Sequence, residues 1–354
     1  MTVNITHICT RFVCNGGAEI FLKDLSCEFN DEIKFRQSIC LEHNYYDDDF
    51  CNSFPHPVVK GGLKEINDAI VNEDVIIFWS DINLNNSNLP KPKICIYNLC
   101  SEHETEIINS NKYINHIIAC STKVTEICKR HSIDYSLILP GISTTSSRLK
   151  ITENKETKRA SLGINKNDFL IGMIARLDDN KRQLELIKVM NCIKYDKIKA
   201  IFIGDSNSPN NNYLDYLKSN STGDNCIFIP HQINIGNWWQ ILDCYCMLSR
   251  SEGCSAALFE SLYFKVPVIS TPVGSYLDIL NSKNSIIIND CKQDLFSAII
   301  KMYNLSLNKS RLTLLKSNEH EMFLRHGDIR QTASKWKELI LRLKNKNDNK
   351  EKFE

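Results

Sequence analysis

Short apolar runs that alternate with helical stretches constrain the fold of this chain more than any other feature. The first series of runs is THICT, RQSICL, DVIIFW, ICIYNL, HIIACS and SLILP, and the second is FLIGMIA, KAIFIG, CIFIP, CYCMLS, VPVIST and SIIIN. These runs are apolar nearly throughout and do not alternate with polar residues, which is the pattern of parallel strands covered on both faces. Strand–helix–strand repetition therefore predicts an α/β fold with parallel sheets and right-handed crossovers.

A polar segment at Ser143–Asn167, rich in Thr, Lys and Glu, separates the two series. This composition is typical of a linker between domains. Near the end of the chain, apolar residues from Ile329 to Leu343 recur at spacings of three and four, as on one face of a helix. We expect a Rossmann-like N-terminal domain at 1–145, a linker at 146–164, a Rossmann-like C-terminal domain at 165–325, a helix packing across both domains at 326–345 and a polar tail at 346–354. The expected ligand site is the cleft between the two domains.

Composition excludes several classes of protein. The 354 residues carry a formal net charge of +1, so no overall positive field indicates a nucleic-acid partner. None of the apolar runs approaches the roughly 18 residues of a membrane-spanning helix, and the N-terminal residues lack the layout of a signal peptide. The 15 cysteines are odd in number and lack a C-x-x-C spacing, which favours reduced, buried thiols over disulfides or zinc ligands. We therefore expect a cytoplasmic protein.

The first candidate ligand-binding motif is NGGAE, in which Gly16 and Gly17 follow the first predicted strand and open a helix. Two glycines allow a ligand to approach the backbone closely, and the N-terminus of a helix attracts anions. The motif is not G-x-G-x-x-G, which argues against a nicotinamide dinucleotide. A simple strand-to-helix turn is the alternative interpretation.

The second motif is IARLDDNK, in which Arg176 ends a predicted strand and Lys181 follows five residues later. Two cations at the carboxyl end of a strand suit a diphosphate, because Arg binds it through two parallel hydrogen bonds and Lys as a point charge. The alternative is a solvated ion pair with Asp178 or Asp179.

The third motif is SEGCSAALFE, which carries Glu252 and Glu260 on either side of the first turns of a predicted helix. Ser255 and Ala256 form the amino end of this helix and offer a second place for an anion. Eight residues of helix rise about 12 Å, so the two carboxylates cannot share a metal ion or act on one bond. They are suited to holding hydroxyls at the two ends of an elongated ligand with a charged middle, as in a nucleotide-sugar. A capping glutamate and an unrelated second one are the alternative.

Together these segments resemble the retaining GT-B glycosyltransferases of glycosyltransferase family 4, the glycosyl transferases group 1. IARLDDNKRQLELI resembles the arginine-leucine…lysine motif of that family, SEGCSAALFESLYFKVPVISTPVGS its signature of two glutamates separated by seven residues, and NGGAE its N-terminal loop. The resemblance covers about residues 12–280. It implies two Rossmann-like domains that face a central cleft, and transfer of a sugar from a UDP- or GDP-linked donor without a metal ion or other cofactor.

The resemblance also implies a role for each matching residue. Arg176 and Lys181 would bind the donor diphosphate, Glu252 the sugar hydroxyls and Glu260 the ribose hydroxyls. On the N-terminal side, Gly16 and Gly17 would approach the phosphate or the acceptor, and Gly274 would line the same cleft. The family usually has a histidine that faces the sugar, and we assign this role to His103, with an ordinary surface histidine as the alternative.

Two features depart from the family or compete with this interpretation. Arg182 stands where the family usually has a glycine after the motif lysine. The acidic stretch YYDDDF, Tyr45–Phe50, resembles a metal-binding D-x-D, but we interpret it as a solvated loop.

The predicted function is transfer of a sugar to a hydroxyl of a glycan or lipid-linked acceptor, in surface polysaccharide biosynthesis. Because many members of the family act at the inner face of the membrane, peripheral contact with that face is left open. Two alternatives also remain open: an enzyme similar to the nucleotide-sugar 2-epimerases, and a non-catalytic protein of the same fold that binds nucleotide-sugars.

Overall fold

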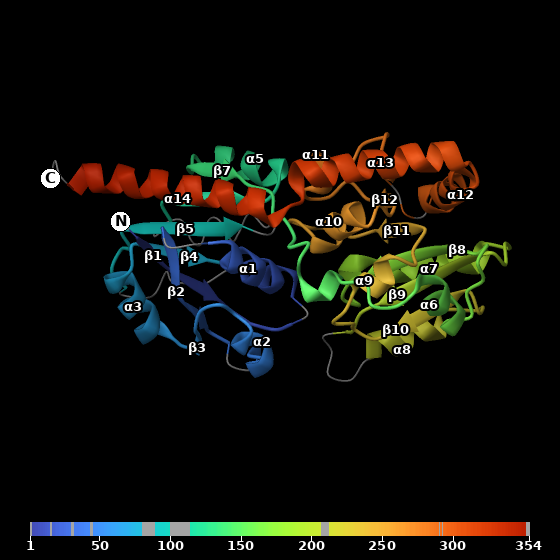
Figure 1. Ribbon diagram of the computed structural model, residues 1–354, viewed down its shortest axis with the longest axis horizontal. Coiled ribbons are helices and arrows are strands. Elements are labelled where there is room, and N and C mark those ends of the chain that lie inside the picture. Colours follow the sequence, from blue (N-terminus) through green and yellow to red (C-terminus); the bar gives the residue numbers. More distant parts are fainter. Residues whose placement is uncertain are drawn as a thin grey trace. The chain divides into compact units, whose positions relative to one another are not determined.

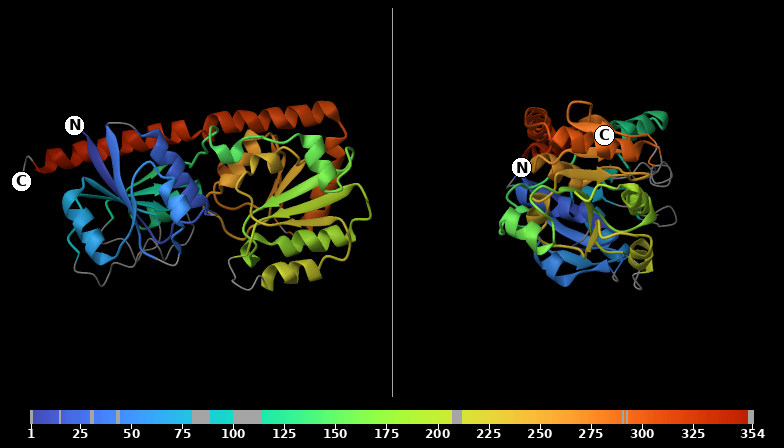
Figure 2. Two further views of the ribbon diagram at one scale, coloured as in Figure 1. Left: turned by 60° about the horizontal axis from the view of Figure 1, so that its bottom comes forward. Right: turned by 90° about the vertical axis from the view of Figure 1, so that its right-hand side faces the viewer.

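The computed structural model describes residues 2–14, 16–29, 32–42, 45–79, 89–99, 114–206, 212–289, 291 and 293–351. The chain forms two compact units. The first unit consists of Met1–Ser143, Glu252–Ala256 and Asp328–Glu354, and the second consists of Thr144–Ser251 and Ala257–Gly327. Each unit contains one parallel sheet with helices packed against it (Figures 1 and 2). The predicted α/β fold class with two doubly wound parallel sheets is confirmed.

The sheet of the first unit has the strand order β3-β2-β1-β4-β5-β6-β7. Its strands are β1 (Val3–Cys9), β2 (Ile33–Cys40), β3 (Val58–Lys60), β4 (Val75–Phe78), β5 (Ile94–Leu99), β6 (His116–Ala119) and β7 (Tyr135–Leu137). Its helices are α1 (Gly17–Glu28), α2 (Asp48–Asn52), α3 (Leu63–Asn72), α5 (Thr122–Arg130) and α14 (Ile329–Glu351). The order in which strands are added reverses between β1 and β4, which defines a doubly wound sheet.

Successive residues of the central strands belong to two separate cores. Val75 and Ile77 of β4 pack in the core that includes α1 and α14, whereas Ile76 and Phe78 pack in the core that includes α3 and α5. All of β4 is therefore buried. Coverage of both faces explains why the run DVIIFW contains so few polar residues.

The sheet of the second unit has the order β10-β9-β8-β11-β12-β13. Its strands are β8 (Phe169–Ile174), β9 (Ile198–Ile203), β10 (Cys226–Ile229), β11 (Cys244–Met247), β12 (Val268–Ser270) and β13 (Ser285–Ile287). The helical elements, beginning with two 3₁₀ turns, are η2 (Ser147–Leu149), η3 (Asp179–Lys181), α6 (Lys155–Ser161), α7 (Gln183–Cys192), α8 (Asn212–Ser219), α9 (Gly236–Trp239), α10 (Ala256–Tyr263), α11 (Tyr276–Ile279), α12 (Asp294–Ser306) and α13 (Lys309–His326). Here the order of strand addition reverses between β8 and β11, which makes their carboxyl ends the expected place for a ligand.

Apolar runs in the sequence predicted every strand of the second sheet, whereas β3 in the first sheet was not predicted. β3 is a three-residue edge strand whose side chains are only partly buried, so it lacks the apolar run that marks the other strands. Short edge strands of this kind carry little signal in a sequence.

The last helix, α14, returns to the first unit. Trp336 is fully buried there and stacks on Trp79, with ring centroids 5.7 Å apart. The start of α14 is also tied to the chain before the second unit, because Ile329 N donates to Ile142 O over 3.1 Å. Among the described residues, the structure contains no helix that is both long and apolar enough to cross a membrane.

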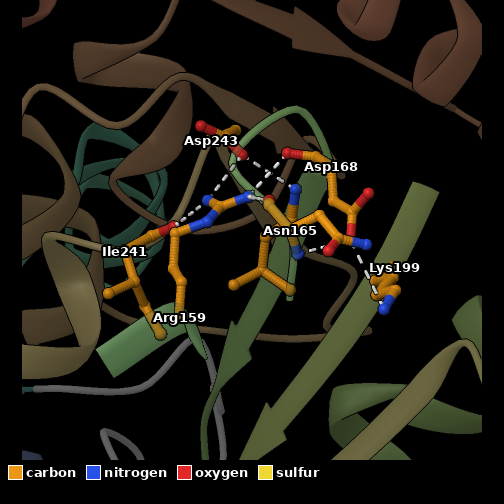
Figure 3. A network of polar contacts seen from close by, with 7 residues as sticks. Arg159, Asn165, Asp168, Lys199, Ile241 and Asp243 are labelled. Atoms are coloured by element: carbon orange, nitrogen blue, oxygen red, sulfur yellow. Dashed lines mark hydrogen bonds and ion pairs between the residues drawn. The ribbon is translucent and has the colours of Figure 1, made fainter. Parts of the chain in front are cut away.

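A buried arginine organises the amino edge of the second sheet (Figure 3). Arg159 of α6 donates to Ile241 O at 2.7 Å and Asp168 O at 2.6 Å, and it forms an ion pair with Asp243 at 3.0 Å. The Asp243 carboxylate also accepts from Leu170 N at 2.9 Å. Because Asp168 precedes β8 and Asp243 precedes β11, the network joins the starts of the two central strands to α6.

Candidate functional site

The two loops that carry the predicted cations and the first glutamate leave neighbouring strands at the same edge of the second sheet. Arg176 follows β8, and the loop that leads to Glu252 follows β11. β8 and β11 pair in parallel, so their carboxyl ends lie side by side. The strand order reverses at this pair, where ligands of doubly wound sheets bind.

The loop after β8 is folded around Asp178. One oxygen of the Asp178 carboxylate accepts from Arg176 Nε at 2.6 Å, and the other accepts from Lys181 N at 3.0 Å, which caps the turn η3. The fully buried Gln183 donates from Nε2 to Arg176 O over 2.8 Å. The ion pair between Arg176 and Asp178, which was the alternative interpretation of this sequence motif, is therefore present. The Arg176 side chain is nevertheless 40% exposed.

Arg182, the residue that replaces the usual glycine, has a left-handed backbone conformation with φ 57° and ψ 39°. Glycine adopts this conformation without the steric penalty of a side chain. A glycine at this position would therefore avoid a local steric cost of the backbone. The Arg182 guanidinium contacts the sulfur of Cys291 at 3.4 Å.

The loop after β8 is hydrogen-bonded directly to the loop after β11. Asn180 Nδ2 donates to Ser251 O at 3.0 Å, and Ser251 N donates back to Asn180 Oδ1 at 3.2 Å. Arg250 N donates to Asn180 O at 2.9 Å. The next residue after Ser251 is Glu252, which is half-buried.

Glu260, in contrast, is 2% exposed and already has two partners in the second unit. Its Oε1 accepts from Arg148 Nη1 at 2.6 Å, and its Oε2 accepts from Trp239 Nε1 at 2.8 Å. Sequence reasoning missed both partners, because Arg148 lies 112 residues before Glu260 and no local pattern links them. The helix that carries Glu260 begins at Ala256, one residue later than expected, so Ser255 lies just before it.

Gly274 follows β12 at the same edge of the sheet. It is buried and has a positive φ of 53°, which explains the glycine. Before it, Thr271 Oγ1 donates to Ser249 O over 2.8 Å and joins the loop after β12 to the loop after β11. Hydrogen bonds therefore connect the loops after three neighbouring strands, β8, β11 and β12.

In the first unit, the helix α1 begins at Gly17 as the sequence predicts, but a carboxylate of the chain itself lies beside its N-terminus. A Cβ at Gly16 would lie 1.9 Å from Glu19 Oε2, so a side chain at this position would require the Glu19 carboxylate to move. Glu19 is 5% exposed and accepts from Arg11 Nε at 2.8 Å. A Cβ at Gly17, by comparison, would have no atom of the described residues within 4 Å, apart from its chain neighbours and its own helix. Within the part of the chain that the structure describes, Gly17 is therefore the less crowded of the two glycines.

Two histidines and the acidic stretch Tyr45–Phe50 remain to be placed in the structure. His103 lies outside the described residues. His116 is 4% exposed and contacts Ser136 Oγ at 2.9 Å, and burial lowers its pKa to about 4, as expected of a structural histidine. In the acidic stretch, Asp47 caps α2 by accepting from Phe50 N at 3.0 Å.

Comparison with known proteins relates the second and third motifs, IARLDDNK and SEGCSAALFE, to a family. Residues 154–318 match the Glycosyl transferases group 1 family. TuaC of Bacillus subtilis, named for teichuronic acid biosynthesis, is 29% identical over 189 residues, which are 53% of this chain and 46% of TuaC. An undecaprenol-linked-glycan α-1,4-N-acetyl-D-galactosaminyltransferase of Campylobacter jejuni is 25% identical over 180 residues, which are 50% of this chain and 49% of that enzyme. The matches thus span about half the length of these relatives.

Similarity of structure extends over nearly the whole chain. Anabaena HepE in complex with UDP-glucose superposes with a TM-score of 0.80 at 16% sequence identity, over 96% of this chain and 99% of HepE. The lipopolysaccharide glycosyltransferase WaaG superposes with a TM-score of 0.70 at 11% identity, over 95% of this chain and 99% of WaaG. At these identities the similarity establishes the fold. Residues 154–318 are therefore similar to the Glycosyl transferases group 1 family, and the chain has the GT-B fold.

Proposed function

We propose that the protein is a glycosyltransferase that moves a sugar from a nucleoside-diphosphate sugar to a hydroxyl of a glycan or glycolipid acceptor, with retention of the anomeric configuration. The observation that supports this most is the junction of the loops after β8 and β11. These hydrogen bonds join the loop of Arg176 and Lys181 to Ser251, the residue before Glu252. The junction lies at the carboxyl edge of the sheet, where ligands of doubly wound sheets bind.

Arg176 and Lys181 are proposed to bind the donor diphosphate. A guanidinium has five N–H donors, and the bond from Arg176 Nε to Asp178 uses one of them, so the Nη groups of this 40% exposed side chain remain suited to phosphate oxygens. In the reaction, the bond between the anomeric carbon and the diphosphate breaks while the acceptor oxygen bonds to that carbon. The departing phosphate oxygen takes the proton of the acceptor hydroxyl. The two cations stabilise the negative charge that grows on the diphosphate.

Glu252 is proposed to bind the sugar hydroxyls and Glu260 the ribose hydroxyls. Each carboxylate oxygen has two lone-pair sites, so the bonds from Arg148 and Trp239 leave one site on each oxygen of Glu260 for a ribose hydroxyl. Because Glu260 is nearly fully buried, we propose that its ion-paired partner Arg148, whose side chain is 20% exposed, shifts when a ribose binds. Ser255 and Ala256 would contribute backbone N–H groups at the start of α10. Gly16, Gly17, Gly274 and His103 keep their proposed roles beside the donor or acceptor.

The names of similar proteins guide the choice of substrates. HepE is described in complex with UDP-glucose, and the Campylobacter jejuni relative is named for an undecaprenol-linked glycan. We therefore propose a UDP- or GDP-linked donor and a glycan or lipid-linked acceptor in surface polysaccharide biosynthesis. This proposal includes action on the cytoplasmic side, with peripheral contact at the inner membrane face.

The test is calorimetric titration of the wild type with UDP and GDP, followed by assays of donor hydrolysis and transfer. Arg176→Ala and Lys181→Ala are each expected to lower turnover by about 10²–10³-fold, because each removes a charge from the leaving group. Lys188→Ala is the matched control, because Lys188 is an exposed cation on α7 that pairs only weakly with Glu185 at 3.4 Å.

Wild-type turnover in both variants would refute the proposed roles of the two cations. Nucleotide binding without hydrolysis or transfer of any donor would favour a non-catalytic binding protein. A change in the configuration of the donor sugar, detected by NMR, would favour a 2-epimerase.

A further inference from the structure

We propose that Asn180 is a positioning residue of the donor site, which holds the loop of Arg176 and Lys181 in register with the loop that leads to Glu252. This inference rests on the proposed function. Asn180 is not one of the charged motif residues, and the sequence pattern predicts no contact between Asn180 and the donor.

The structural reason lies in the pairing of the two central strands. β8 and β11 share two register pairs, Ile171–Cys244 and Gly172–Tyr245. Beyond them, β8 continues to pair with β9 as far as Ile174–Ile203, and β11 continues with β12 as far as Met247–Ser270. The ladder between β8 and β11 therefore ends before the loops begin, and it does not hold the loops together.

Asn180 connects the two loops beyond the end of this ladder. Its side-chain amide both donates to and accepts from the backbone of Ser251, and its carbonyl oxygen accepts from Arg250 N. The side-chain amide thus satisfies both polar groups of one peptide-bonded residue, as a neighbouring strand would. A side chain that bonds two backbone groups at once restricts both the distance and the relative orientation of the loops.

The Asn180–Ser251 contact lies directly beside two residues of the proposed donor site. Asn180 directly precedes Lys181, and Ser251 directly precedes Glu252. A shift between the loops would change the spacing between the cations proposed for the diphosphate and the carboxylate proposed for the sugar. A displacement of about 1 Å at a catalytic group can lower a rate by about 10²-fold. By contrast, a nucleoside diphosphate without a sugar does not use Glu252 and should tolerate the same shift.

The chain provides a matched control at the other end of α7. Asn191 Nδ2 donates to Asn220 O at 2.8 Å, and Asn191 Oδ1 accepts from Thr222 N at 3.1 Å. This is the same residue type, and its amide likewise donates to one backbone carbonyl and accepts from one backbone N–H, although these belong to two residues. It lies at the end of α7 that is remote from Lys181, and it has no role in the proposed site.

The experiment compares the wild type with Asn180→Ala, Asn180→Asp and Asn191→Ala in the full chain. UDP and GDP affinity is measured by calorimetry, and turnover is measured as hydrolysis of UDP-glucose and GDP-mannose, using the donor that the wild type hydrolyses faster. Asn180→Ala should lower kcat by about 10–100-fold and change the affinity for the nucleoside diphosphate by less than about threefold. Asn191→Ala should leave both quantities unchanged, although both variants lose two hydrogen bonds.

Asn180→Asp keeps the shape of the side chain and the acceptor for Ser251 N, but it replaces the donor to Ser251 O by an oxygen. It should therefore also lower kcat, and it serves as the test if Asn180→Ala does not fold. Equal kcat values for the Asn180 variants and Asn191→Ala would overturn the inference. A loss of nucleotide affinity as large as the loss of kcat in the Asn180 variants would also overturn the inference, because it would indicate general disruption of the site. A wild type that binds neither nucleotide would instead refute the proposed function itself.

Discussion

Replacement of Arg159 by methionine is expected to destabilise the second unit by about 3–5 kcal/mol. Arg159 is 5% exposed and donates to Ile241 O, Asp168 O, Asn165 O and the Asp243 carboxylate over 2.6–3.3 Å. A hydrogen bond to a charged group contributes about 1.5–3 kcal/mol, and removal of one partner of a buried ion pair typically costs about 3–5 kcal/mol. Adding the contributions of the four hydrogen bonds one by one would give a larger loss. We use the range for a broken ion pair, about 3–5 kcal/mol, because Asp243 is 28% exposed and water will replace part of the interaction that its carboxylate loses.

Scanning calorimetry of the full chain measures this effect. For a unit of this size, each kcal/mol lowers Tm by about 2–4 °C, so the transition of the second unit should fall by roughly 10 °C. Asp243→Asn is the milder comparison, since an amide oxygen still accepts from Leu170 N, whose bond to Asp243 is 2.9 Å long. Turnover per folded molecule should not change, because the network lies at the amino edge of the sheet and the proposed site lies at the carboxyl edge.

A loss smaller than about 1 kcal/mol in Arg159→Met, or one no larger than in Asp243→Asn, would refute the reasoning. Either result would mean that the four hydrogen bonds of Arg159 do not hold the starts of β8 and β11 in place.

Two other perturbations test local features of the structure. Arg182→Gly should raise the free energy of unfolding by about 0.5 kcal/mol. Removing a side chain from a left-handed residue gains about 1–2 kcal/mol, and the greater flexibility of glycine in the unfolded chain costs about 0.5–1 kcal/mol. Chemical denaturation measures the free energy of unfolding, and a loss of stability would show that the contact of Arg182 with Cys291 contributes more than the backbone strain costs. Burial lowers the pKa of His116 and of His56 to about 4, so the unfolded chain binds more protons than the folded chain between about pH 6.5 and pH 4. Stability should therefore fall as the pH drops through this range, by up to about 1.4 kcal/mol per pH unit for each histidine. His116→Asn should flatten the dependence of the urea midpoint on pH, and curves parallel to the wild type would contradict this assignment.

Local sequence patterns were enough to predict the architecture. Runs such as DVIIFW are apolar throughout because alternate residues enter two different cores, and this requires helices on both faces of a sheet. The motif residues Arg176 and Lys181 could also be placed from the sequence, because they follow a recognisable strand and parallel strands end at the same edge. β3 was missed because a partly exposed edge strand has no comparable pattern.

The contacts of the candidate site could not be predicted in the same way. The Arg148–Glu260 ion pair joins residues 112 positions apart, and the Asn180–Ser251 contact joins residues 71 positions apart. Likewise, the sequence suggested an anion beside Gly16, and only the structure reveals that the Glu19 carboxylate lies there.

The amino-acid sequence alone determined that this chain forms two parallel α/β sheets and which charged residues follow the strands of the second. These properties depend on the periodicity of burial and on the chain order, which are written along the sequence. The tertiary structure alone decided which partners those charged residues have, such as Arg148 and Trp239 for Glu260 and Asp178 for Arg176. A side chain's partners depend on which distant segments the fold brings within about 3 Å, and hydrogen bonds form only at that range.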